Sequence, residues 1–242
     1  GPRELRIDGA YQIESRTLQC TMAAADDKTF FTTQPLVAQA ALRCLRGENV
    51  RVVVTPESLP CLELAVERDV LVAPRRLQLL YGSFTPACLA LAKRFAPGLQ
   101  ALSLGLPDGK LPDGLLDVVR SATSLEELRI SSLSGSIADD GGDEFDDDPL
   151  VRLFDAFVES RAPVRLLDLE RISKPCAVAG FVNYTPTVTH LDVVGAKNSE
   201  DFARDITHAL SDGVKQRLLE FTGGFVSPKI ATEGHGFTSL RA

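Results

Sequence analysis

Residues 99–130 read LQALSLGLPDGKLPDGLLDVVRSATSLEELRI and contain one full period of a recurring pattern. The segment begins and ends with the spacing LxxLxL, first at residues 99–104 and again at residues 125–130. Between them lies GLLDVVRSA, whose apolar residues are three and four positions apart. Alternating apolar residues favour a short strand with one buried face, and the wider spacing favours an amphipathic helix. The period therefore predicts a strand, a turn, a helix and a return segment.

The same apolar pair recurs along most of the chain. It starts at residues 52, 77, 102, 128, 167, 191 and 219, and a weaker copy lies at Leu5 and Ile7. The successive intervals are 25, 25, 26, 39, 24 and 28 residues, so one interval is longer than the others by about half a period. A constant period of this length predicts similar units that stack and share a continuous core.

Helical patterns follow several of the expected strands. They read PACLALAKRF, GLLDVVRSA, LVRLFDAFVES and DFARDITHAL. Thr55-Pro56, Thr85-Pro86 and Asp148-Pro149 each place a side-chain oxygen before a proline. Such pairs suit the start of a helix, where the oxygen caps free amides and proline loses no hydrogen bond. We therefore predict an α/β fold with parallel strands on one side and helices on the other.

This combination over residues 50–224 resembles the leucine-rich repeat superfamily, and most closely its ribonuclease-inhibitor-like and F-box-associated cysteine-containing classes. The resemblance implies a solenoid of about seven to eight repeats, with parallel strands on the concave face and helices on the convex face. The family usually has Asn or Cys three positions after the apolar pair, and this chain has other residues there, as in a divergent member. The alternative is an ordinary α/β protein with regularly spaced strands, but neither GxGxxG nor GxxxxGK[ST] occurs.

The pattern predicts a single leucine-rich repeat domain over residues 3–242, after Gly1-Pro2, which we interpret as the scar of an expression tag. Residues 3–49 are expected to form irregular N-terminal repeats or a cap, with a hairpin pattern at 11–22 and a helical pattern at 36–45. Regular repeats are expected over 50–224, with a loop insertion at 136–149, and residues 225–242 as a C-terminal cap or tail.

The long interval contains an acidic run, in which seven of the ten residues 139–148 are acids. The net charge of the chain is −7, so 26 acidic and 26 basic residues are left without these seven. The acidity is therefore local, and its spacing does not fit a calcium-binding loop. We interpret the run as an acidic loop, in which Phe145 is the candidate anchor for a partner.

Composition argues against several classes of protein. No dense basic cluster is present, so nucleic acid is not an expected partner. No run of 18 apolar residues occurs, so no membrane association is expected. The five cysteines form no CxxC pair, which favours a reducing intracellular compartment, cytoplasmic or nuclear.

The candidate site lies on the expected concave face. The residue between the two apolar positions of each strand should point there, giving the column Val53, Gln78, Ser103, Arg129, Asp168, Asp192 and Glu220. The last three are acids on neighbouring strands, with Glu170 and His190 beside them, whereas Arg51, Arg76 and Arg129 make the other end more basic. Like charges on adjacent strands repel, so this surface invites a cationic partner.

Two other interpretations of the acids were weighed. They could be solvated residues whose repulsion is screened by salt. They could also bind a divalent metal, although a ladder of carboxylates offers fewer converging oxygens than such ions require. The predicted partner-binding residues are Arg76, Arg129, Asp168, Glu170, His190, Asp192, Glu220 and Phe145.

A catalytic interpretation would combine Cys176, His190 and Asp192 as nucleophile, base and orienting acid. Cys176 is expected in a helical return segment and His190 on the concave edge, so the three should not meet. We therefore predict no enzyme activity, no metal and no cofactor.

The function predicted from the sequence is a non-catalytic protein–protein interaction module, a scaffold or adaptor of a larger intracellular assembly. Its partner would present a basic segment to the concave face and the acidic loop. Two alternatives follow only from the resemblance: a substrate-recognition arm of a ubiquitin ligase, and a GTPase-regulating leucine-rich repeat protein.

Overall fold

The computed structural model describes residues 11–14, 17–20, 51–56, 59–67, 74–107, 111–132, 148–172, 174–194 and 199–223. These residues form an α/β structure with one nine-stranded sheet. The strands are β1 (Tyr11–Glu14), β2 (Thr17–Cys20), β3 (Arg51–Val54), β4 (Arg76–Leu79), β5 (Ala101–Leu106), β6 (Glu127–Ser132), β7 (Leu166–Glu170), β8 (His190–Val194) and β9 (Glu220–Gly223). The helices are α3 (Leu59–Glu67), α4 (Pro86–Phe95), η1 (Ala96–Gly98), α5 (Leu115–Ser121), α6 (Pro149–Ser160), α7 (Pro175–Tyr184), α8 (Ser199–Ala209) and α9 (Asp212–Arg217).

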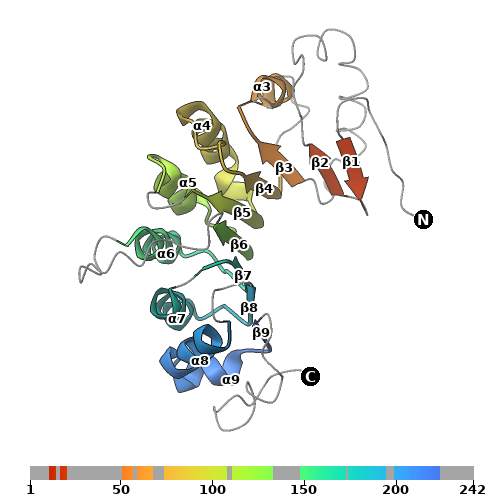
Figure 1. The fold of residues 1–242 in the computed structure, drawn as a ribbon. Coiled ribbons are helices and arrows are strands. Elements are labelled where there is room, and N and C mark those ends of the chain that lie inside the picture. Colours follow the sequence, from red (N-terminus) through yellow and green to blue (C-terminus); the bar gives the residue numbers. More distant parts are fainter. Residues whose placement is uncertain are drawn as a thin grey trace.

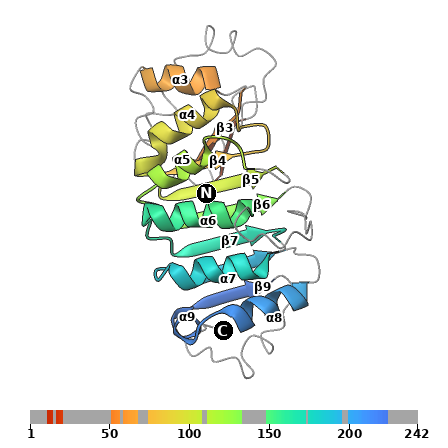
Figure 2. The same ribbon diagram turned by 90° about the vertical axis from the view of Figure 1, so that its left-hand side faces the viewer.

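The strands follow one another across the sheet in the order of the sequence. β1 and β2 pair antiparallel, which confirms the predicted hairpin, and all later pairs are parallel. The helices lie side by side on one face of the sheet, and the strands line the inner side of a curved arrangement (Figures 1 and 2). The helix predicted at residues 36–45 lies outside the described residues.

The predicted apolar pairs align across six strands. Val52 lies opposite Leu77, and the same register continues through each first position as far as Leu191. The long interval does not disturb it, since Leu128 lies opposite Leu167. Insertion into the connection between two strands thus leaves their pairing intact.

The last strand departs from the prediction. Leu191 lies opposite Phe221, whereas the pattern had assigned this place to Leu219. The short helix α9 ends at Arg217, and the next residue, Leu218, is fully buried in the core, so Leu219 becomes the residue before the strand. β9 is therefore shifted by two residues, and Glu220 lies opposite His190.

Five successive strands begin with the same backbone arrangement. Two consecutive amides at each strand start donate to one carbonyl at the start of the preceding strand, with N···O distances of 2.8–3.2 Å. The accepting carbonyls belong to Arg75, Gln100, Glu126, Arg165 and Thr189. This shared geometry fixes the lateral position of each strand against its neighbour.

The core lies between the sheet and the helices. Leu102, Leu104 and Leu128 each expose at most 1% of their surface, and leucines of the facing helices pack against them. The rings of Phe154 and Phe181 stack with centroids 4.6 Å apart and join α6 to α7. Burial of this continuous apolar layer is the main stabilising contribution to the fold.

Two predicted helix caps are confirmed. Thr85 Oγ1 accepts a hydrogen bond from the Cys88 amide (3.3 Å), and Asp148 Oδ1 accepts one from the Leu150 amide (2.8 Å). The third, Thr55, precedes residues 57–58, which lie outside the described part, and α3 is described from Leu59. α6 begins at Pro149, the last residue of the predicted insertion. Residues 133–147, which include all of the acidic run except Asp148, lie outside the described residues.

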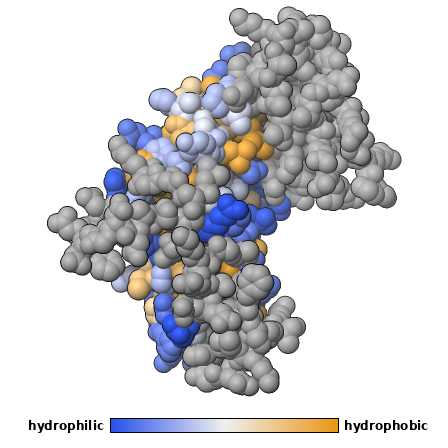
Figure 3. All heavy atoms as spheres, viewed as in Figure 1, coloured by the Kyte–Doolittle hydropathy of each residue, from blue (hydrophilic) through white to orange (hydrophobic). Residues whose placement is uncertain are grey.

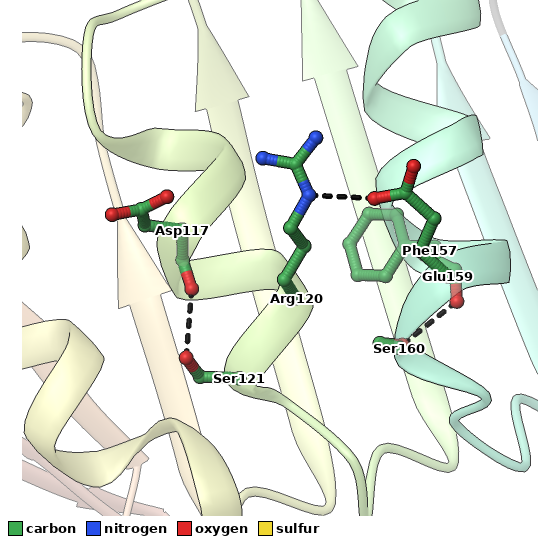
Figure 4. A network of polar contacts seen from close by, with 6 residues as sticks. All are labelled: Asp117, Arg120, Ser121, Phe157, Glu159 and Ser160. Atoms are coloured by element: carbon green, nitrogen blue, oxygen red, sulfur yellow. Dashed lines mark hydrogen bonds and ion pairs between the residues drawn. The ribbon is translucent and has the colours of Figure 1, made fainter.

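Polar contacts connect successive helices at the outer surface. Lys93 on α4 pairs with Asp117 on α5 (Nζ–Oδ2 2.9 Å). Arg120 on α5 pairs with Glu159 on α6 (Nε–Oε2 2.6 Å), as Figure 4 shows. At the other end, Arg217 of α9 donates to the carbonyls of Val182, Thr185 and Val188 and so satisfies backbone groups at the end of α7 and in the segment between α7 and β8.

Candidate functional site

The candidate site lies on the face of the sheet opposite the helices. Gln78, Ser103, Asp168 and Asp192 are half-buried there, and Arg129 is exposed. Each of these residues stands between two buried apolar residues of its strand, as period-two alternation requires. We call this surface the open face. Strongly hydrophilic residues reach the surface in the middle of the molecule (Figure 3).

The open face of β5 carries only the small residues Ala101, Ser103 and Gly105. Arg76 on β4 reaches across this strand to Glu127 on β6, with Nη2–Oε1 at 3.5 Å. The charge of Arg76 is therefore balanced by Glu127. Arg76 and Arg129 do not together form the more basic end of the face that the sequence suggested.

A shallow hollow of about 130 Å³ lies further along the open face. Four neighbouring strands, β6 to β9, contribute to it. Its lining consists of Arg129, Leu166, Asp168, His190, Leu191, Asp192 and Glu220. Five of the residues predicted from the sequence are thus brought together in one place.

The carboxylates of the hollow have different neighbours. Asp168 lies directly opposite Asp192, and Arg129 Nε is 3.6 Å from Asp168 Oδ2. Asp192 Oδ1 is buried and accepts no hydrogen bond from the described residues. Burial raises the pKa of Asp192, and the charges of Asp168 and Glu220 raise it further. Ionisation of Asp192 is therefore less favourable than that of an ordinary, solvent-exposed aspartate.

His190 is positioned by Thr189, the residue just before β8. Its Nδ1 lies 2.8 Å from Thr189 Oγ1, and its Nε2 lies 4.0 Å from Glu220 Oε2. The sequence had placed Glu220 in one column with Asp168 and Asp192, but the shift of β9 places Thr222 opposite Asp192. The predicted three-acid column is wrong at this position, although Glu220 still reaches the hollow.

Three predicted site residues lie elsewhere. Glu170 ends β7, where it is exposed and pairs with Arg171 (Oε1–Nε 3.7 Å). Arg76 lies on β4 and does not line the hollow. Phe145, the candidate anchor of the acidic loop, lies outside the described residues.

The residues considered for catalysis lie on different layers. Cys176 is exposed near the start of α7, in the helical layer, whereas His190 and Asp192 face the open side of the sheet. Within the described part of the chain, no group of three or more His, Cys, Asp or Glu side chains is arranged to hold a metal ion. No helix described here is long and apolar enough to cross a membrane.

Sequence reasoning missed the apolar part of the hollow. Leu166 lines it beside the charged groups, whereas Leu191 also borders it but has its side chain buried in the core. Leu166 occupies a position that other strands fill with Arg76, Glu127 or His190. A leucine at an outward position of a strand was the signal that could have revealed this contact surface.

Comparisons with protein-family models, curated proteins and solved structures found no match for this chain.

Proposed function

We propose that the chain is a non-catalytic protein-binding module, a scaffold or adaptor of a larger assembly, and that its open face binds a partner with a basic segment. The single observation that carries the proposal is the hollow, in which carboxylates of three adjacent strands gather around an apolar contact. A cationic group would relieve the repulsion between these carboxylates.

The size of the hollow supports binding of a side chain rather than of a whole small molecule. Its volume of about 130 Å³ is below the range of about 300–1,000 Å³ that is usual for small-molecule sites. A rigid face with a small charged depression suits a protein partner that places one residue in the depression and spreads over the surrounding strands.

We also propose that the fold is a divergent leucine-rich repeat solenoid. The support is the sequential order of the strands, their shared backbone geometry at five strand starts, and the alignment of the apolar pairs. Such units present a broad curved surface, which is the usual binding surface in repeat proteins.

Capture of partners from a cell lysate tests the proposed function, with the wild-type chain and a variant carrying Asp168→Asn, Asp192→Asn and Glu220→Gln. We expect the variant to lose at least about tenfold in capture of any partner that a salt gradient elutes from the wild type, because three attractive charges are removed.

A matched control carries Glu63→Gln, Asp113→Asn and Asp155→Asn, which removes the same charge from exposed positions away from the open face. It should capture the partner as the wild type does. Equal capture by all three chains would reject the open face as the binding surface.

A further inference from the structure

The hollow already contains a cation of the chain itself. Arg129 lines it, and its Nε lies 3.6 Å from Asp168 Oδ2. This distance is longer than a hydrogen bond, and both side chains are accessible to solvent. Arg129 is therefore held there by a loose ion pair, which an incoming group of the same charge could replace.

Arg129 neutralises only part of the negative charge in the hollow. Three carboxylates face one guanidinium, so two formal negative charges are left when His190 is neutral. Asp192 Oδ1 is shielded from solvent, and no donor in the described part of the chain reaches it. A buried carboxylate oxygen without a donor makes ionisation of Asp192 costly, and a cation in the hollow would offset this cost through its charge.

The lining also selects between cations. Leu166, which is half-buried on the open face, provides an apolar surface for the stem or the flat face of a long side chain. Asp168 and Asp192 lie directly opposite each other on adjacent strands, which are about 4.8 Å apart. A guanidinium presents five N–H donors in a rigid plane and can serve two carboxylates, whereas an ammonium acts as a point charge.

We infer that the hollow receives one arginine side chain of a protein partner, and that Arg129 occupies part of this place in the free chain. The inference rests on the proposed function and specifies the chemistry that the open face recognises. It also predicts the effect of Arg129 on affinity. Although Arg129 lies in the binding surface, it competes with the arginine of the partner, so its removal should strengthen binding.

The test is a titration of the full chain, followed by the backbone amide NMR signals of residues 166–168 and 190–193. The probes are three blocked tripeptides with arginine, lysine or citrulline between two glycines. We expect the arginine probe to shift these signals with a dissociation constant on the order of millimolar, the lysine probe to bind at least about threefold more weakly, and citrulline not to bind.

Two matched variants separate competition from overall charge. Arg129→Gln and Arg76→Gln each remove one positive charge from the open face, but only Arg129 lines the hollow. Arg129→Gln should tighten binding of the arginine probe about threefold to fivefold, and Arg76→Gln by less than about twofold. Asp192→Asn should weaken it by about tenfold. Dispersion of the same amide spectrum shows that each variant is folded.

Equal binding of the arginine and lysine probes, or equal effects of Arg129→Gln and Arg76→Gln, would overturn the inference. So would the absence of any shift in Arg129→Gln at probe concentrations up to about 20 mM. In each of these cases the lysate experiment could still support the proposed function, because it depends on the summed charge of the face and not on one arginine.

Discussion

The two faces of the sheet use the same strands in different ways. On the helical face, Leu102, Leu128 and Leu167 occupy the same place on successive strands and are almost fully buried. On the open face, the residues that follow them are Ser103, Arg129 and Asp168, which differ in size and charge. The repeated face determines the fold, and the variable face provides the positions at which a binding surface can be specified.

The largest expected effect is a loss of stability, and it should differ between two neighbouring residues of β5. Leu104 is fully buried on the helical face, so Leu104→Ala should lower the free energy of unfolding by about 3 kcal/mol, because it loses apolar burial and leaves a cavity. Urea denaturation followed by circular dichroism measures this change.

Ser103→Ala is the matched control, since Ser103 points to the open face. It should change stability by no more than about 0.5 kcal/mol. Similar losses for the two variants would break the distinction between the faces.

A smaller change in the free energy of unfolding, this time an increase, is expected for Asp192→Asn. Burial and two neighbouring carboxylates raise the pKa of Asp192, so the folded chain binds this proton more tightly than the unfolded chain. As pH rises from about 4 through the raised pKa, ionisation of Asp192 therefore reduces stability. The variant removes this cost and should be more stable at pH 7, by less than about 1 kcal/mol because the side chain is only partly buried.

Denaturation at several pH values between about 4 and 7 measures this difference. The stability of Asp192→Asn should depend less on pH than that of the wild type, whereas Asp155→Asn on the outer surface of α6 should follow the wild type. A variant that loses stability at neutral pH would show that Asp192 makes a favourable contact in its ionised form.

The smallest expected effect concerns the outer helical surface. Arg120 and Glu159 form a short ion pair, but both side chains are about half exposed. A double-mutant cycle with alanine at each position should give a coupling energy of about 0.5 kcal/mol, which falls further in 1 M salt. A coupling of several kcal/mol would mean that charge pairs, and not only the apolar layer, hold neighbouring helices together.

Most of the fold could be predicted because its cause is local. The spacing of the apolar pairs places the strands from Val52 to Leu191 in the observed register, and the proline-linked caps at Thr85 and Asp148 mark helix starts. The exception is β9, where the sequence offered the apolar pair Leu219 and Phe221. Leu218 is buried instead, and the extra helix α9 delays the strand by two residues, which no local pattern reveals.

The site could be predicted less completely. Alternation along the strands identified the outward residues, so Asp168, His190 and Asp192 were expected near one another. Their ion pairs depend on side-chain conformations and on neighbours two strands away. Arg76 reaches Glu127 only because the residue between them is Ala101, and a pattern read along one strand does not contain this information.

The sequential order of the strands also determines how the chain gains its native contacts. Every described strand pairs with the strand that precedes or follows it in the chain. No pairing has to wait for a distant segment to arrive, so the entropy lost in closing each loop is modest. Each new strand can therefore be added to a neighbour that already lies next to it in the chain, and the sheet can extend from one pair of strands.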